Sequence, residues 1–198
     1  MKRIVIASLL AVFLIGGILS CKKTDTPTET KTVVKDSLKM VFRGPHYTLY
    51  SLKEGKEIPI ADSATTKWDF AISFSNIIVN SHASGPGQAG IIAQYGIYND
   101  FKTAPTTGYA YDTTTTRLAI DGNPKSPNAW YVYNPVNHGF APKAGLFFVL
   151  KTADGKYAKL EITDVNYADY PTGSMYPNFL IYKFRYLYQR DGSTNLSE

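Results

Sequence analysis

Three side chains of this sequence have the chemistry of iron ligands, and each falls in a segment predicted to be a loop. His138 follows the aromatic run Trp130–Tyr133, in a segment with a proline on either side. His82 lies in a glycine-rich segment, and Met175 lies in a segment rich in tyrosine and proline. Imidazole nitrogens and thioether sulfurs both bind iron in proteins. We therefore treat these three side chains as candidate iron ligands.

The aromatic residues around His138 would suit the wall of a ligand pocket. Tyr131 and Tyr133 precede the histidine and Phe140 follows it, and heme sites are typically apolar and aromatic. These three are the candidate pocket residues. The alternative for His138 is an ordinary surface histidine that bonds the backbone. The alternative for the glycines around His82 is plain turn formation.

Enzyme chemistry finds little support in the motifs. The chain has a single cysteine, Cys21, and carries neither a Gly-x-Ser-x-Gly nucleophile elbow nor a His-Glu-x-x-His metal motif. The glycine-rich segment Asn80–Gly90 lacks the Gly-Lys-Ser/Thr ending of a phosphate-binding loop, and no helical pattern follows it. The net charge of +5 is spread along the chain, so nucleic acid is not expected as a partner. The sequence indicates a binding protein that is not an enzyme.

The first 35 residues are predicted to direct and attach the chain rather than to fold. Lys2 and Arg3 precede the apolar run Ile4–Leu19, which is typical of a signal peptide over residues 1–20. Cys21 follows directly, in the position of a lipoprotein cysteine whose thiol carries lipid, and acyl chains would hold it on a membrane. Residues 21–35 are polar and rich in threonine, which favours a lipidated, disordered tether.

Residues 36–198 are predicted to form a single, mostly antiparallel all-β domain with little helix. Apolar and polar residues alternate in several segments, as in strands with one buried face, and no helical period is sustained. Asp154-Gly155 favours a tight hairpin turn. The predicted strands are Tyr47–Leu52, Trp68–Phe74, Ile77–Val79, Gly90–Tyr95, Arg117–Ile120, Trp130–Tyr133, the two arms of the hairpin Leu146–Thr163, and Phe179–Arg190, and the predicted loops include Asn134–Gly145 and Asp164–Pro177.

Several motifs in a fixed order carry a family resemblance. They are Trp68–Ala71, Asn80–Gly87, Trp130–His138, Lys151–Ile162 and Tyr182–Thr194. In that order they resemble the HmuY family of heme-binding lipoproteins. The resemblance implies an all-β, outer-membrane-associated lipoprotein that captures heme and passes it to a TonB-dependent receptor. It also implies iron held by histidines from loops, with His138 near the second of the family's pair.

The second axial ligand and the ligand class have alternatives in the sequence. Asp121–Asn128, where the resemblance would put the family's first histidine, contains neither histidine nor methionine. His82 or Met175 would therefore supply that ligand, and a related porphyrin could replace heme. The alternative function is non-heme binding or adhesion, for example to glycans through exposed tyrosines. The expected location is the outer membrane, with a lipid anchor and a domain that faces the periplasm or the cell surface.

Overall fold

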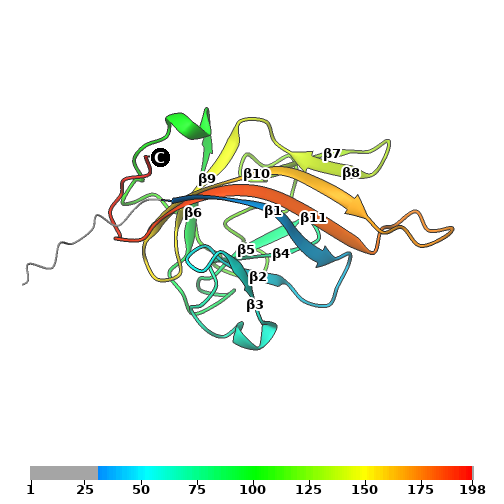
Figure 1. The fold of residues 1–198 in the computed structure, drawn as a ribbon, viewed down its shortest axis with the longest axis horizontal. Helices are drawn as coiled ribbons and strands as arrows, with labels where there is room; N and C mark the ends of the chain where they lie inside the picture. Colours follow the sequence, from blue (N-terminus) through cyan, green and yellow to red (C-terminus); the bar gives the residue numbers. More distant parts are fainter. Residues whose placement is uncertain (1–30, 198) are drawn as a thin grey trace, which may run out of the picture.

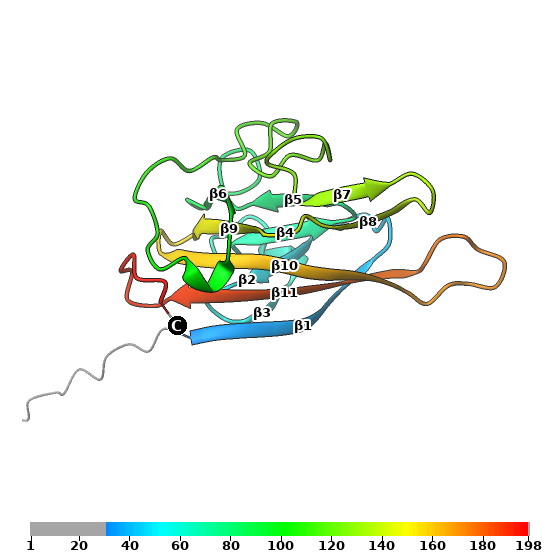
Figure 2. The same cartoon turned by 90° about the horizontal axis from the view of Figure 1, so that it is seen from above.

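Two antiparallel sheets pack face to face in the computed structural model, which describes residues 31–197 (Figures 1 and 2). The larger sheet contains, in spatial order, β1 (Lys31–Val41), β11 (Phe179–Gln189), β10 (Tyr157–Ala168), β9 (Leu146–Lys151) and β6 (Gly90–Tyr95). The smaller contains β3 (Lys56–Ile58), β2 (Thr48–Ser51), β4 (Phe70–Ser73) and β5 (Asn76–Val79). A separate hairpin pairs β7 (Tyr131–Asn134) with β8 (Gly139–Pro142).

The predicted all-β class is confirmed. Helical structure in residues 31–197 is limited to two short 3-10 turns, η1 (Ile60–Asp62) and η2 (Tyr98–Asp100). No helix in this part of the chain is long and apolar enough to span a membrane. The predicted signal peptide and the lipid attachment at Cys21 lie outside the described residues.

Alternation of apolar residues explains why β11 lies inside the larger sheet, between β1 and β10. One face buries five apolar side chains against the smaller sheet: Leu180, Tyr182, Phe184, Tyr186 and Tyr188. Leu187 is buried on the opposite face, because η2 and the C-terminal segment cover the sheet there with Tyr98 and Leu196. Around Leu187, β11 is therefore buried both by the smaller sheet on one face and by η2 and the C-terminal segment on the other.

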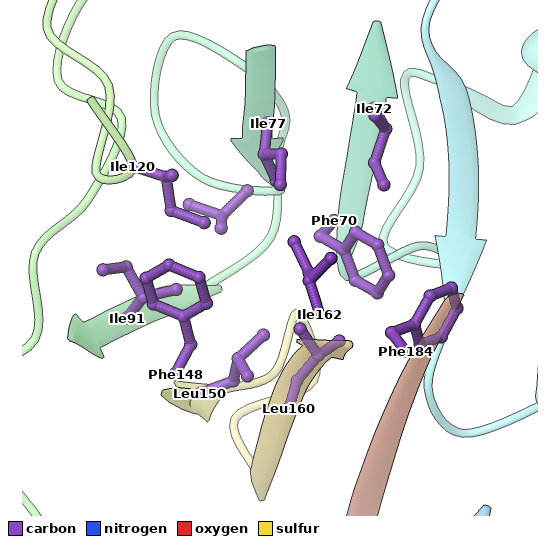
Figure 3. Close-up of a pocket in the computed structure, with 11 residues that line it drawn as sticks. Phe70, Ile72, Ile77, Ile91, Ile120, Phe148, Leu150, Leu160, Ile162 and Phe184 are labelled. Atoms are coloured by element: carbon purple, nitrogen blue, oxygen red, sulfur yellow. The ribbon is translucent and has the colours of Figure 1, made fainter. Parts of the chain in front are cut away.

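The interior between the two sheets is closely packed (Figure 3). Side chains from both sheets point toward one another around an apolar void of about 10 Å³: Phe70, Ile72, Ile77, Val79, Ile91, Ile120, Phe148, Leu150, Leu160, Ile162 and Phe184. A space of that size holds at most about one water molecule, and an apolar lining gives a water no partner. The interior is therefore a core and not a ligand cavity.

The strands run between two ends of the molecule that differ in composition. We define the turn end as the end that contains the β9–β10 turn (residues 152–156) and the segment 80–89, which bonds to it through Gln88 N and Ala153 O. We define the loop end as the end that contains the β10–β11 loop (residues 169–178), the β4–β5 turn and the β7–β8 hairpin (Figure 2). Tyr157 and Tyr167 lie toward opposite ends of β10, roughly 30 Å apart at about 3.3 Å per residue.

The structure corrects the predicted loop Asn134–Gly145. Residues 139–142 form β8, which pairs with β7 in register from Tyr131 and Pro142 to Asn134 and Gly139. Pro142 is compatible with this strand because it lies at the open end of the hairpin, where a missing N–H breaks no central ladder. The segment that carries His138 is therefore the turn of a hairpin rather than an irregular loop.

Three other features differ from the predictions: two strand boundaries and one predicted strand. β10 continues to Ala168, beyond the hairpin end predicted at Thr163, after a register shift between Ile162 and Asp164. The strand predicted at Arg117–Ile120 is wrong, because this part contributes only an isolated bridge to residue 114. β1 begins at Lys31, five residues before the predicted start of the domain, so the last part of the predicted tether is a strand.

Candidate functional site

The tip of the β7–β8 hairpin presents His138 to solvent. Asn134 accepts a hydrogen bond from the N–H of Val136 (2.9 Å), and Asn137 accepts one from the N–H of Gly139 (3.0 Å), so local side chains stabilise the turn. His138 lies between these turns with φ of 55°, a conformation that histidine rarely adopts. The hairpin therefore holds the imidazole in an exposed and conformationally costly position.

The imidazole of His138 is oriented by its neighbour on the opposite strand. Its Nδ1 lies 2.7 Å from the hydroxyl oxygen of Tyr133, which is about half exposed. When Nδ1–H donates to this oxygen, Nε2 carries the free lone pair, which is the arrangement that metal-binding histidines use. In that tautomer, Nε2 of this exposed imidazole would be available to a metal ion.

The other two predicted pocket residues, Tyr131 and Phe140, anchor the base of the hairpin in the core. Tyr131 and Phe140 are buried in the main core. The Tyr131 hydroxyl donates to the carbonyl of Gly122 (2.7 Å), and the Phe140 N–H donates to the hydroxyl oxygen of Tyr167 (2.8 Å). Of the three predicted pocket residues, only Tyr133 reaches the surface. Tyr131 and Phe140 fix the base from which the hairpin projects.

The β10–β11 loop carries Met175 at the same end of the molecule (Figures 1 and 2). The Met175 side chain is 84% exposed. The next residue, Tyr176, stacks on Phe42 with ring centroids 5.8 Å apart, and the Arg43 guanidinium lies 4.8 Å from the centre of the Tyr176 ring. These contacts attach the loop to Phe42 and Arg43 at Tyr176, the residue next to Met175.

Large exposed hydrophobic side chains gather at the loop end. Ten are exposed in the described part of the chain, and seven of them belong to the β7–β8 hairpin, the β10–β11 loop and the adjoining end of β1: Val41, Val132, Tyr133, Val136, Tyr170, Met175 and Tyr176. Concentration of apolar surface in one region marks a binding site in a soluble protein more often than scattered exposure does.

Backbone conformations of higher energy gather at the same end. Five non-glycine residues in the described chain have positive φ, and four of them lie at the loop end: Arg43, Phe74, His138 and Asp169. Each such conformation costs of order 1 kcal/mol or more, and strained backbone is concentrated at ligand sites in many proteins. The loop end therefore combines strain with exposed apolar surface.

A sequence profile described as HmuY protein matches residues 44–180. This chain belongs to the HmuY family. A search of curated proteins found no match. Among solved structures, the chain is similar to an apo HmuY analog from Tannerella forsythia, with 18% identity, a TM-score of 0.49, and coverage of 79% of this chain and 96% of that one.

Two further solved structures are similar to this HmuY family member. A protein from Bacteroides vulgatus, described as HmuY-like and heme-binding, shares 18% identity with a TM-score of 0.46, over 82% of this chain and 93% of that one. A protein from Bacteroides fragilis, described as a lipoprotein, shares 11% identity with a TM-score of 0.38, over 81% of this chain and 90% of that one.

His82 lies at the turn end of this family member, apart from the other two candidate ligands. Its ring meets the edge of Tyr111 at 5.4 Å, and Ser81 beside it forms a bridge to Gln88, which bonds to the β9–β10 turn. That turn and the β7–β8 hairpin contact opposite ends of β10, roughly 30 Å apart. The structure therefore brings His138 and Met175 to one end and places His82 at the other.

The glycine-rich segment around His82 has a structural explanation. The Asn80 side chain donates to the Trp68 carbonyl (2.7 Å) and accepts from the N–H of Gly87 (2.9 Å). A Cβ atom on Gly85 would lie 2.2 Å from the Asn80 oxygen, and one on Gly87 would lie 2.6 Å from the Asn80 carbonyl. Glycine is required here because the backbone wraps closely around a buried amide.

The structural role of two buried aspartates at the turn end was not predicted from the sequence. Asp112 accepts hydrogen bonds from the N–H groups of Val79 (2.8 Å) and Ala119 (2.7 Å). Asp69 accepts them from Leu52 (2.7 Å) and Ala153 (2.9 Å). Burial raises the pKa of both carboxyl groups, that of Asp69 to about 6. The only sequence signal was an aspartate beside each strand, which also describes many surface residues.

The candidate ligands at the loop end could provide two donors from two separate hairpins. In the part of the chain that the structure describes, no group of three or more His, Cys, Asp and Glu side chains could hold a metal ion. One imidazole and one thioether suit the axial positions of a porphyrin iron, whose other four ligands come from the macrocycle. The residues at this end therefore fit a heme better than they fit a free metal ion.

Proposed function

We propose that this HmuY family member binds heme at the loop end, with His138 Nε2 as an axial ligand of the iron. The observation that carries the proposal is the 2.7 Å contact between His138 Nδ1 and the Tyr133 hydroxyl, on an exposed hairpin tip. Membership of the HmuY family supports it. The apolar side chains that surround this tip at the loop end supply a surface for a flat macrocycle.

Met175 is the proposed second axial ligand. It lies at the same end as His138, on a different hairpin, and its thioether is exposed. Tyr133, Val136 and Tyr176 are also exposed on these two hairpins and could contact a macrocycle bound by both of them. Methionine paired with histidine is a known axial combination for heme iron.

The chain's residues would bind and release the heme rather than use it in a reaction. Bound heme would supply the iron and an apolar face. Tyr133 would orient the His138 imidazole, the hairpin tips would exclude water from the iron, and the core residues Tyr131 and Phe140 would support the site from below. A carrier needs affinity and release and no catalytic turnover. We expect one imidazole ligand with aromatic contacts to give about micromolar affinity, which corresponds to about −8 kcal/mol.

The cellular role is proposed from the family and from the front of the chain. We propose a lipoprotein that is attached to the outer membrane through lipid on Cys21 and that passes heme to a TonB-dependent receptor. Its domain would face the periplasm or the cell surface. Replacing Cys21 with serine should move the protein from the detergent phase to the aqueous phase. Unchanged partitioning would contradict a lipid at that residue.

Heme titration of the mature chain with Cys21→Ser tests the binding proposal. Wild type should give a saturable Soret shift, and His138→Ala should weaken binding at least tenfold and change the spectrum. His82→Ala is the matched control, because it removes an exposed imidazole at the turn end. Absence of a saturable shift in wild type would end the proposal. Equal binding by His138→Ala with the same spectrum would end the site assignment alone.

Glycan binding would use a different part of the surface. A polar cleft of about 600 Å³ is lined by Tyr47, Asn76, Tyr111 and Arg117 together with threonines 113, 115 and 116. Hydroxyl, amide and aromatic groups in one cleft are suited to a sugar. Binding on a glycan array that is lost in Tyr111→Ala, together with a flat heme titration, would favour this alternative.

A further inference from the structure

We propose that Arg43 forms a carboxylate-binding site at the loop end, which recognises a propionate of the bound tetrapyrrole and so favours the free acid over its ester. This inference rests on the proposed heme function and assigns a residue to it. Arg43 lies one residue before the span that matches the HmuY profile, so the family match does not assign it. A heme with free propionates carries two carboxylates that a guanidinium can bind, and its dimethyl ester carries none.

The Arg43 guanidinium is held in place by aromatic rings. It lies 4.8 Å from the centre of the Tyr176 ring and 5.3 Å from the centre of the Phe42 ring, and these two rings stack on each other. A guanidinium that stacks on an aromatic face keeps its N–H groups free at the edge of its plane. Arg43 is therefore ready to donate two parallel hydrogen bonds to a carboxylate.

Among residues 31–197, no carboxylate forms an ion pair with Arg43. The ion pairs in the described part of the chain use Lys53, Lys56, Lys67, Lys183 and Arg185, and none of them includes Arg43. The nearby loop residue Asp169 accepts a hydrogen bond from the Asn178 side chain (3.0 Å). Among the described residues, Arg43 thus pairs with aromatic rings alone, and its positive charge remains available to a ligand.

The backbone at Arg43 adopts a conformation that favours glycine. Its φ is 52°, in the turn that the Gly44 N–H closes by donating to the Val41 carbonyl (3.1 Å). A left-handed conformation costs a non-glycine residue of order 1 kcal/mol. Arginine at this position is therefore unfavourable for folding, and a ligand contact would explain its presence.

Aromatic rings link Arg43 to both hairpins of the proposed site. Tyr176, on which the guanidinium stacks, is the residue after Met175. Phe42 also meets Phe74 edge-on at 5.2 Å, and Phe74 meets Phe140 at 5.3 Å. This continuous row of rings leads from Arg43 to the base of the hairpin that carries His138. A tetrapyrrole bound between the two hairpins would therefore have an edge near Arg43.

The test combines one substitution with one change of ligand. In the mature chain with Cys21→Ser, wild type and Arg43→Gly are titrated with heme and with heme dimethyl ester. Arg43→Gly relieves the positive φ, so it should fold at least as stably as wild type in urea. We expect it to weaken heme binding about tenfold and to leave ester binding unchanged, because only the free carboxylate pairs with Arg43. Arg117→Ala, in the polar cleft, is the control and should change neither.

The outcomes separate this inference from the proposed function. Equal weakening for heme and ester would overturn it, because Arg43 would then act only by supporting Tyr176. An unchanged affinity for both ligands would also overturn it, while the heme proposal would stand. No saturable binding of either porphyrin by wild type would end the heme function and this inference with it.

Discussion

The turn end and the loop end of the molecule differ in how their connecting segments are held and in which side chains they expose. At the turn end, buried polar side chains such as Asp69, Asn80 and Asp112 satisfy backbone groups and hold the connecting segments against the sheets. At the loop end, the connections project into solvent, and apolar side chains such as Val136 and Met175 are exposed there. One end has its partners within the chain, and the other presents surface that a ligand could cover.

Strain follows the same division. Among residues 31–197, positive φ at non-glycine residues is found at Arg43, Phe74, His138 and Asp169 on the loop end, and at His82 on the turn end. The turn end uses glycine where the backbone must come close, as at Gly85 and Gly87 around the Asn80 amide. The comparison shows that the turn end uses glycine where its backbone is crowded, whereas the loop end keeps larger residues in backbone conformations that are unfavourable for folding.

The largest expected effect comes from removing the buried carboxylate of Asp112. Asp112→Ala would leave the N–H groups of Val79 and Ala119 without acceptors in the core. Two unsatisfied buried donors and the loss of charge-assisted bonds should lower the free energy of unfolding by about 3–5 kcal/mol. Urea unfolding measures this loss, and Asp191→Ala, at an exposed aspartate, should stay within about 0.5 kcal/mol of wild type. A loss below about 1 kcal/mol in Asp112→Ala would contradict the role.

The next effect is a pH dependence due to Asp69 at the turn end. Burial raises the pKa of Asp69 to about 6, above the ordinary value near 3.9, so the native state takes up a proton that the unfolded state lacks between those values. The contribution of this group to stability is therefore fully present below about pH 4 and falls by about 3 kcal/mol as the pH rises through 6.

Asp69→Asn tests that pH dependence because asparagine does not titrate. Urea unfolding of wild type and the variant at pH 4.5 and pH 7.5 should show wild type losing about 2 kcal/mol more than the variant across this range. Parallel pH profiles for the two proteins would show that Asp69 does not titrate as described. Heme binding by the folded protein should be the same for both, because Asp69 lies at the turn end.

A smaller effect is expected on ligand binding at Met175. Met175→Leu keeps an apolar side chain of similar size and removes the sulfur, so it should weaken heme binding about tenfold and leave urea unfolding unchanged. Met175→His should bind at least as tightly as wild type, with a spectrum typical of two imidazoles. Identical spectra for wild type and Met175→Leu would exclude the thioether as a ligand.

The smallest effect distinguishes strain at the two ends. His82→Gly and His138→Gly should each raise the free energy of unfolding by up to about 1 kcal/mol, because glycine adopts positive φ at little cost. Heme binding should be unchanged in His82→Gly and strongly weakened in His138→Gly. Equal heme affinity in the two variants would mean that the strain at His138 has no connection with the ligand.

The parts of the fold that were predictable from the sequence carry a clear period and a clear turn. Asp154-Gly155 and the alternation around it predict the β9–β10 hairpin, and the long alternation after Phe179 predicts β11. β10 was predicted too short because the register shift between Ile162 and Asp164 breaks the alternation midway. A bulge of this kind has no reliable signal in a single sequence.

The candidate site was only partly predictable. His138 and Met175 were identified by residue type, but their shared location follows from β10 and β11, which set the two hairpins at one end. The β7–β8 hairpin was missed because Pro135 and Pro142 are typical of loops. Asp112 was missed for two reasons. Its partner Val79 is distant in the sequence, and its partner Ala119 lies in a segment that was wrongly predicted to be a strand.

Both termini of the described chain lie at the turn end. Lys31 pairs with Tyr188 at the start of β1, and after β11 the C-terminal segment folds back so that the Leu196 N–H bonds to the Lys102 carbonyl (Figure 2). Any attachment made through either terminus, whether to a membrane, a sensor chip or a fused partner, holds the protein by the end opposite the loop end. Chain topology therefore leaves His138, Met175 and Arg43 at the end of the domain farthest from such an attachment.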